Sequence, residues 1–376
     1  MASKTNCTIN GYDYYRQSKV IGHKENGDPV RKWFYGKNKT ESEKKYKEFM
    51  LSNSVDENIT FGQMAYYYTY NVLIYDSSIA STTLAEYERA YRLYLKERPV
   101  TIKPLAKITA KDIQTHFNLL SAEHSTPVRQ LHKFLKKFFA YAEIDGLTTN
   151  PMSAITVPVK RKKDEALDNE VITFSDGEMQ AILKNLKTNR IRLLIKLAAA
   201  TGMRIGELLG LKYENIHDGY VSVVRQHCSY YQINNDGTRE LVYEDRPPKA
   251  NSYRDIPYPA NLENEIKLHK ELHYQESRQN GYESEYVFTT QTGHQLDPRN
   301  VRRAWKRFLL SIDVEPKKFH ALRATYGTSL SKAGVAIETT CSLMGHKSIK
   351  TTYKYYINVE DDQKIKAASK INSLFG

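Results

Sequence analysis

The chain has 376 residues, with 56 Lys or Arg against 43 Asp or Glu, so its formal net charge is +13. This length allows two or three domains with cores of their own, and the charge is typical of a protein that binds a polyanion such as nucleic acid. The scattered cysteines Cys7, Cys228 and Cys341 argue against a disulfide framework and against a cysteine zinc site. No apolar run reaches the roughly 18 residues of a membrane span, so we expect a cytoplasmic protein without a membrane partner.

Residues 1–52 predict a small β-sheet followed by one helix. Residues 12–21 and 30–35 mix β-branched and aromatic residues, as strands do. Thr40 and Glu43 have the spacing of a capping box, which predicts the start of the helix. The sheet would either lie in a DNA groove or be a plain hairpin with a solvated charged face. The basic residues that we expect it to present to DNA are Arg31 and Lys32.

Residues 60–155 predict a compact domain of four or five short helices. Thr60, Thr83 and Thr109 are placed to cap three of them, and Pro127 suits the first turn of a fourth. The fourth helix has an apolar side for a core and a basic side that fits phosphate contact, although a solvated face is the usual reason for such a pattern. The basic residues of that helix are Lys133, Lys136 and Lys137.

Residues 156–171 break the helical pattern and are expected to form an interdomain linker. Four consecutive cations at 160–163 would be able to follow a phosphate backbone, and a nuclear-import signal is the weaker alternative. The linker residues that we expect to contact DNA are Lys160 and Arg161.

A strongly apolar helix at 191–200 opens the core of the last part of the chain. A glycine turn follows it and leads to Arg204, with Glu207 one helical turn later. A carboxylate at that spacing can orient the guanidinium, although an ordinary surface ion pair has the same spacing.

Three antiparallel strands are predicted at 221–230, 240–243 and 253–258. Lys249 lies in the turn between the last two strands, where a lysine is usually exposed to solvent. Residues 298–309 then predict a helix with one apolar and one densely cationic side. The cations of that helix that we expect to contact DNA are Arg302 and Arg303.

The C-terminal part holds two histidines, an arginine and several tyrosines at short spacing. His320 and Arg323 are three residues apart on a predicted helix and therefore project from one face. Gly345 ends a second short helix and places His346 at the start of the next segment, nine residues before Tyr355. Such a set suits phosphoryl transfer through a covalent tyrosine, in which cations hold the phosphate and the tyrosine oxygen attacks it. Tyrosines near a C-terminus are otherwise more often packing residues.

In this order the parts resemble the tyrosine recombinases, the integrase family of phages and conjugative transposons. Residues 172–360 carry the strong match. The similar segments are the first arginine box at Ala200-Thr201-Gly202-Met203-Arg204, the second box at His320-x-x-Arg323, the third histidine at Leu343-Met344-Gly345-His346, the β-hairpin lysine at Lys249 and the nucleophile at Tyr355. The chain departs from the family in having Tyr353 and Tyr356 beside the nucleophile position, so Tyr356 remains the alternative nucleophile.

The resemblance implies a multidomain protein that is mainly α-helical with small antiparallel sheets. It assigns an arm-type DNA-binding domain to 1–52, a helical core-site DNA-binding domain to 60–155, a basic linker to 156–171, and an α+β catalytic domain with a C-terminal tail to 172–376. A weaker match, at residues 31–37, is to integrases from transposons and prophages of Gram-positive bacteria.

The resemblance also implies a site-specific recombinase that cleaves and rejoins DNA through a 3′-phosphotyrosyl intermediate, so that a mobile element or prophage is integrated and excised. Such an enzyme needs no metal or ATP cofactor. Its partners would be double-stranded DNA at core and arm sites, three further copies in a homo-tetramer, and an accessory bending or excision factor. The implied catalytic residues are Arg204, Lys249, His320, Arg323, His346 and Tyr355, with Glu207 in support.

Two rival hypotheses remain at this point. A type IB-like topoisomerase would use the same chemistry to reseal the same strand, although the expected arm-type domain argues against it. An inactive DNA-binding or architectural protein would have the same charge without the chemistry.

Overall fold

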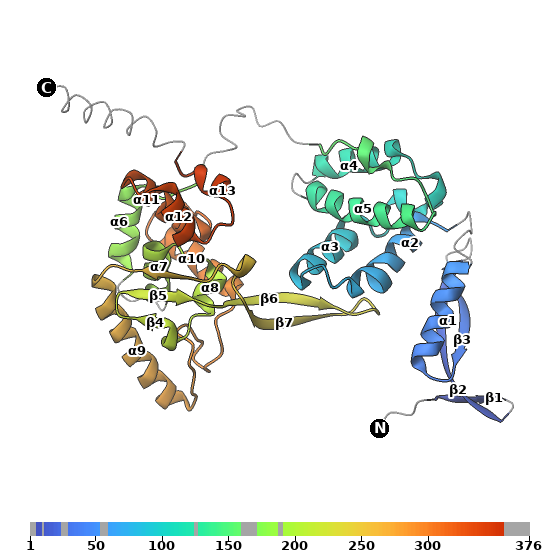
Figure 1. Ribbon diagram of the computed structural model, residues 1–376, viewed down its shortest axis with the longest axis horizontal. Helices are drawn as coiled ribbons and strands as arrows, with labels where there is room; N and C mark the ends of the chain where they lie inside the picture. Colours follow the sequence, from blue (N-terminus) through green and yellow to red (C-terminus); the bar gives the residue numbers. More distant parts are fainter. Residues whose placement is uncertain are drawn as a thin grey trace. The chain divides into compact units, whose positions relative to one another are not determined.

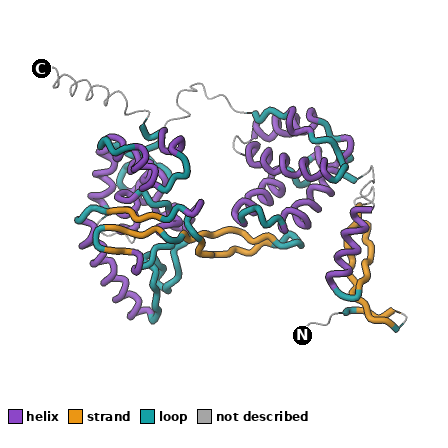
Figure 2. The backbone as a smooth tube through the Cα atoms, viewed as in Figure 1, coloured by secondary structure: helices purple, strands orange, loops and turns teal. Residues whose placement is uncertain are grey.

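The computed structural model describes residues 5–9, 11–23, 29–52, 59–123, 127–158, 171–186 and 191–356. The chain divides into two compact units, Met1–Arg161 with Tyr230–Leu241, and Lys162–Ser229 with Val242–Gly376. Figures 1 and 2 show that helices predominate and that the strands form small antiparallel sheets, which confirms the expected fold class. Within the described ranges, no helix is both long and apolar enough to cross a membrane.

The N-terminal sheet has the order β1-β2-β3 and is antiparallel. Its elements are β1 (Cys7–Ile9), β2 (Tyr12–His23), β3 (Pro29–Gly36) and the helix α1 (Lys39–Ser52) that follows. Phe34 of β3 is buried and meets Tyr46 and Phe49 of α1 edge-on, with ring centroids 5.1 and 5.4 Å away. The Ser42 hydroxyl donates to the Phe34 carbonyl at 2.9 Å, so α1 is fastened to the strand as well as packed on it.

The start of α1 differs from the prediction. The side chain of Asn38 accepts a hydrogen bond from the Glu41 backbone at 2.9 Å, and the Glu41 carboxylate accepts one from the Lys37 backbone at 2.8 Å. The helix therefore begins two residues before the expected Thr40 box, because Asn38 is itself a strong capping residue with an acid three positions later.

Aromatic residues fill the core of the helical part of the first unit. Phe61, Phe138 and Phe139 are fully buried, and the Phe61 ring lies 5.4 and 5.5 Å from the other two. Ile233, from the Tyr230–Leu241 segment, belongs to the same core. The elements are α2 (Phe61–Tyr67), a π-helical turn (Tyr68–Val72), α3 (Ser81–Tyr94), α4 (Ala110–Glu123) and α5 (Pro127–Ile144), with short 3-10 turns between them.

Two of the three predicted threonine caps are present in this part. The hydroxyls of Thr60 and Thr109 accept backbone hydrogen bonds at 3.2 and 3.3 Å. The predicted cap at Thr83 is wrong, because α3 already begins at Ser81 and its N-cap, Ala80, makes no side-chain hydrogen bond.

The second unit packs helices and a small three-stranded sheet around the apolar helix α7. Its helices are α6 (Asp176–Asn185), α7 (Arg192–Thr201), α8 (Ile205–Leu209), α9 (Asn261–Asn280), α10 (Pro298–Ser311), α11 (His320–Lys332), α12 (Ile337–Met344) and α13 (Ile349–Tyr353). The core joins Leu194 and Leu197 of α7 with Trp305 of α10 and Leu322 of α11, all at most 1% exposed.

The predicted strand at 221–230 is wrong as a single element. The chain forms β5 (Tyr220–Val223), leaves that sheet at Val224, and starts β6 (Gln226–Ile233) in another sheet. Two adjacent valines, Val223 and Val224, break the alternation that one half-buried strand would keep. The first sheet has the order β4-β5-β8 and the second pairs β6 with β7; the remaining strands are β4 (Ile216–His217), β7 (Arg239–Arg246) and β8 (Arg254–Pro257).

Two glycines let α8 lie directly against the backbone of β6. A Cβ atom on Gly206 would be 3.0 Å from the His227 carbonyl oxygen, and one on Gly210 would be 2.9 Å from the His227 nitrogen. A methyl group has no room there unless the backbone shifts. This contact fixes the short helix that follows Arg204.

We therefore expect Gly210→Ala to lower the free energy of unfolding by about 1–3 kcal/mol, because the added carbon collides with backbone. Urea unfolding followed by tryptophan fluorescence measures it, since Trp305 lies in the same core. Gly177→Ala is the control: its Cβ would meet nothing within 4 Å inside α6, so a gain of about 0.5–1 kcal/mol is expected. A Gly210→Ala protein as stable as wild type would contradict the packing described here.

Candidate active site

Arg204 is positioned by a left-handed turn at the end of α7. Gly202 has φ +61°, and a Cβ atom there would lie 2.4 Å from the Tyr326 ring, so only glycine fits. Arg204 follows as the N-cap of α8. Its Nη1 donates to Glu207 Oε1 at 2.7 Å, and its Nη2 donates to the Gly345 carbonyl at 3.1 Å. The predicted support of Arg204 by Glu207 is therefore a real contact.

Glu207 is buried between two arginines. Its side chain is 0% exposed, and Arg254 of β8 donates to both of its oxygens, at 3.2 and 2.8 Å. Burial alone would raise the pKa of Glu207, but the hydrogen bonds and charge of Arg254, and then of Arg204, hold it below its ordinary value. Glu207 is therefore a carboxylate with two guanidinium partners.

Sequence reasoning missed Arg254 as a site residue. It lies on the same side of β8 as the fully buried Ile256, two residues on, but an alternation over only four residues is a weak signal of an inward-pointing arginine. Its Nε donates to the Leu343 carbonyl at 2.8 Å, and its Nη1 also donates to the Ser252 carbonyl at 3.0 Å.

Arg323 projects from the first turn of α11 and is only 2% exposed. Its Nη1 donates to the Gly202 carbonyl at 2.7 Å and its Nη2 to the Met344 carbonyl. Its buried Nε has no hydrogen-bond partner among the described residues. Burial and the charge of Arg204 lower the pKa of Arg323 to about 9, which still leaves it positive at neutral pH. A bound anion would favour the charged guanidinium and so offset both effects.

The three arginines meet at the C-terminal end of α12. The carbonyls of Leu343, Met344 and Gly345 accept hydrogen bonds from Arg254, Arg323 and Arg204 in turn. Helix C-terminal carbonyls lack partners within the helix and carry partial negative charge, so they suit guanidinium groups.

His346 follows this turn and faces Tyr355. Its Nδ1 lies 2.9 Å from the Thr352 hydroxyl, and its ring stacks on that of Tyr355 with centroids 6.2 Å apart and an angle of 11°. Burial and the charges of Arg323 and Arg204 lower the pKa of His346 to about 3, so its imidazole is neutral at physiological pH.

His320 starts α11 one turn before Arg323 and keeps an exposed surface. Partial desolvation of its ring, with the charges of Arg323 and Lys354, lowers its pKa. The imidazole is therefore biased toward its neutral form, in which one ring nitrogen is free to accept a proton.

The three tyrosines have different environments. Tyr355 is 3% exposed, packs with Ala324 and Met344, and has the Lys354 ammonium 5.1 Å from its ring centroid. Tyr356 instead donates its hydroxyl to the Val335 carbonyl at 2.7 Å, and the same oxygen lies 2.6 Å from that of Thr340. Tyr353 is 49% exposed. Of the three, Tyr355 is the tyrosine that stacks on His346.

Lys249 lies in a strained turn before β8. It is exposed and starts a 3-10 turn in which Ala250 and Asn251 have φ +66° and +54°. The hydrogen bond from Arg254 to the Ser252 carbonyl attaches this turn to Glu207, but within the described ranges Lys249 itself makes no hydrogen bond or ion pair.

Most of the candidate DNA-contact residues that the structure describes are exposed. Those on the surface are Arg31, Lys32, Lys133, Lys136, Arg302 and Arg303. Lys137 differs, because its ammonium lies 2.5 Å from the Asp76 carboxylate, and that hydrogen bond lowers the pKa of Asp76 to about 2. Lys160, Arg161 and the tail after residue 356 lie outside the described residues.

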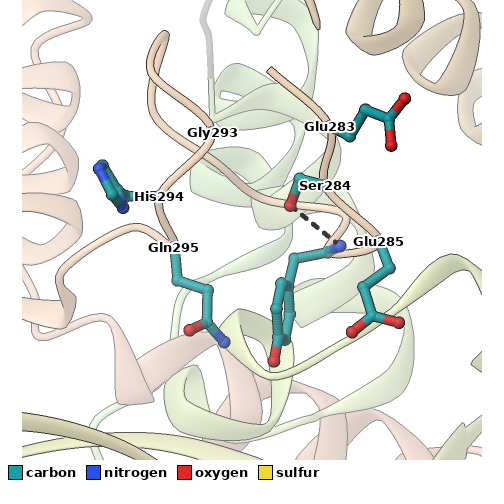
Figure 3. A pocket seen from close by; sticks show the side chains of 7 residues that line it. Glu283, Ser284, Glu285, Gly293, His294 and Gln295 are labelled. Carbon is teal, nitrogen blue, oxygen red and sulfur yellow. Dashed lines mark hydrogen bonds between the residues drawn. The ribbon is translucent and has the colours of Figure 1, made fainter.

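A hollow of about 670 Å³ lies in the loops between α9 and α10, apart from these arginines (Figure 3). Ser284 accepts a hydrogen bond from the Tyr286 backbone at 3.3 Å, and Glu283 and Glu285 give the lining acidic character. None of Arg204, Arg254 or Arg323 lines it, and its carboxylates would repel a phosphate.

Comparison with known proteins identifies the family of this chain. Residues 173–363 match the phage integrase family, and a tyrosine recombinase XerC-like protein from Caldanaerobacter subterraneus subsp. tengcongensis is 34% identical over 100% of both chains. The chain belongs to the phage integrase family of tyrosine recombinases. The protein is thus a site-specific recombinase that cleaves and rejoins DNA strands through a phosphotyrosine.

Further integrases share this family's sequence or fold. The integrase of Staphylococcus phage L54a is 24% identical over 72% of this chain and 81% of its own length. The Tn1549 transposon integrase bound to circular intermediate DNA has a similar fold, with a TM-score of 0.63, 17% identity, and coverage of 82% of this chain and 99% of that one. A lambda integrase dimer bound to a COC′ core site gives a TM-score of 0.56 at 18% identity, covering 94% of each chain.

The depressed pKa of His346 makes acid stability a test of this geometry. Its folded pKa of about 3 lies below the ordinary 6.5, so the unfolded chain takes up the proton first as the pH falls. The stability that the neutral ring contributes is therefore present above pH 6.5 and is lost toward pH 3. We expect urea midpoints to fall more steeply across this window in wild type than in His346→Gln. Parallel curves for the two proteins would show that the ring is not held neutral by its surroundings.

Proposed function

We propose that Arg204, Arg323 and His346 hold the scissile phosphate and that Tyr355 attacks it in line. The product would be a 3′-phosphotyrosine and a free 5′-hydroxyl. The observation that carries the proposal is the convergence of two arginines and the Tyr355–His346 stack on the C-terminal end of α12. In the reverse step a 5′-hydroxyl attacks the phosphotyrosine and releases the tyrosine.

Electrostatics would supply most of the acceleration. Charge grows on the non-bridging oxygens in the pentacoordinate transition state, and preorganised donors in a buried site stabilise it without reorganisation. Arginine suits this role because its fork matches two phosphate oxygens and it keeps its proton. The reaction needs neither metal nor ATP, because the arginines supply the positive charge and the phosphotyrosine conserves the energy of the phosphodiester bond.

Two further residues would move protons. His320, whose neutral form is favoured, would take the proton of the attacking phenol. Lys249 would give a proton to the leaving 5′-oxygen, a role that fits an ammonium on an exposed turn to which Arg254 donates a hydrogen bond. Glu207 would hold Arg204 in place without touching the substrate.

For the rest of the chain we propose the division of labour that the family resemblance implies. Residues 1–52 would bind arm sites, 60–155 core sites, 156–171 would link the domains, and 172–376 would carry out the chemistry. Of the expected DNA contacts, Lys137 is the weakest candidate, because Asp76 already neutralises it.

Strand exchange requires several active sites, so we propose a homo-tetramer on DNA that integrates and excises a mobile element or prophage in the cytoplasm, with an accessory bending or excision factor. The phage and transposon relatives support the kind of element. The lambda integrase solved as a tetramer on a Holliday junction, with a TM-score of 0.56 at 19% identity, supports the assembly.

Tyr355→Phe is expected to abolish the covalent protein–DNA adduct on a nicked suicide duplex that carries the recombination site, while DNA binding in a gel-shift assay survives. Tyr356→Phe is the matched control. It should keep adduct formation within about tenfold of wild type, because it loses only the hydrogen bonds of its hydroxyl to Val335 and Thr340, each of which contributes about 1 kcal/mol to stability. An adduct that persists in Tyr355→Phe and disappears in Tyr356→Phe would reverse the assignment.

Lys249→Ala should slow cleavage of ordinary DNA by about 10²–10⁴-fold, the usual contribution of a general acid. The same variant should cleave a substrate with a 5′-phosphorothiolate at nearly the wild-type rate, because a thiolate leaves without being protonated. Lys270→Ala, which removes a lysine from α9 of the same unit, is the control. If both substrates slow equally in Lys249→Ala, Lys249 is not the acid.

A further inference from the structure

Arg254 differs from its two neighbouring arginines in how fully its donors are used. It makes four hydrogen bonds, two to the Glu207 carboxylate and one each to the Leu343 and Ser252 carbonyls. A guanidinium has five N–H groups, so Arg254 has about one left for any ligand. Among the described residues, the side chain of Arg204 makes only two hydrogen bonds, and so does that of Arg323.

Exposure separates Arg254 from Arg204 but not from Arg323, which is itself only 2% exposed. The Arg254 side chain is 5% exposed and Glu207 is 0% exposed, whereas Arg204 is 24% exposed. Arg204 therefore faces an incoming phosphate, and Arg254 lies behind Glu207. The chain is fitted closely around it, because a Cβ atom on Gly345 would be 2.9 Å from the Arg254 Nη1.

A carboxylate next to the phosphate-binding arginine would weaken the binding of the phosphate. Glu207 orients Arg204, but its negative charge also opposes a phosphate bound to the same guanidinium. Because Arg254 binds both oxygens of Glu207, the pair is neutral, and the charges of Arg204 and Arg323 remain for the substrate.

We propose that Arg254 is a positioning residue for DNA cleavage: it neutralises and holds Glu207, so that Arg204 keeps its charge and its free N–H groups for the scissile phosphate. The inference rests on the proposed role of Arg204. Arg254 acts through Glu207 and through the backbone at Leu343 and Ser252, and does not touch DNA.

The test compares single-turnover adduct formation on the nicked duplex, at saturating protein, for wild type, Arg254→Met, Glu207→Gln and the double variant Glu207→Gln/Arg254→Met. Arg254→Met leaves Glu207 buried with Arg204 alone, so cleavage should fall by about 10²–10³-fold, as on loss of an oxyanion donor. The double variant removes the unbalanced carboxylate and should be at least about tenfold faster than Arg254→Met, a non-additivity that a merely structural role would not produce. DNA binding is measured separately and should change little.

Thermal unfolding is recorded for every variant, and Arg225→Met, which removes an arginine paired with Glu214 on the same unit, is the matched control. Arg254→Lys keeps the charge without the fork and should stay within about tenfold of wild-type cleavage. This variant decides the question if Arg254→Met does not fold. A folded double variant no faster than Arg254→Met, or a folded Arg254→Lys slowed as much as Arg254→Met is expected to be, would overturn the proposal. A wild-type protein that forms no adduct would instead overturn the proposed function.

Discussion

The site depends on one short run of backbone. Three consecutive carbonyls, from Leu343 to Gly345, each bind a guanidinium from a different part of the chain: β8, α11 or the N-cap of α8. A helix end has no partner of its own for these carbonyls, and the partial negative charge there attracts cations. Because one helix terminus receives all three, segments more than a hundred residues apart along the chain are brought to a common point. The next residue is His346, and its ring stacks on the ring of Tyr355.

This arrangement places several positive charges close together with few negative charges to balance them. Arg204 and Arg254 share one carboxylate, Glu207, and the buried Nε of Arg323 has no acceptor in the described part of the chain. Buried charges without full compensation reduce stability, and proteins retain them where function needs them. Burial, together with this positive charge, lowers the pKa of His346 and of His320, so both imidazoles are biased toward neutrality beside a cluster of cations. The site is therefore built to be completed by an anion.

The sequence predicted the local features of the site better than the long-range contacts between them. The glycine before Arg204, the three-residue spacing of His320 and Arg323, and the glycine before His346 are local features, and local patterns determine turns and helix faces. The sequence left Tyr355 and Tyr356 as alternatives, and the difference lies in long-range contacts, since the Tyr356 hydroxyl bonds to residues 16 and 21 positions earlier. Long-range pairing also explains why the neutralisation of Lys137 by Asp76 was not foreseen. Arg254 was missed because a four-residue strand gives too short an alternation to stand out.

The left-handed glycines at 202 and 345 have a consequence for how the chain tolerates changes in length. Each turns the backbone just before a residue of the site: Gly202 lies two positions before Arg204, and Gly345 lies one position before His346. One added residue in either spacer would displace the following side chain by up to about 3.8 Å of backbone. That step exceeds the 2.9 Å between His346 and Thr352, so the contact would be lost at once. Surface loops of the protein can accept insertions, but an insertion after either of these two glycines would displace the site residue that follows it.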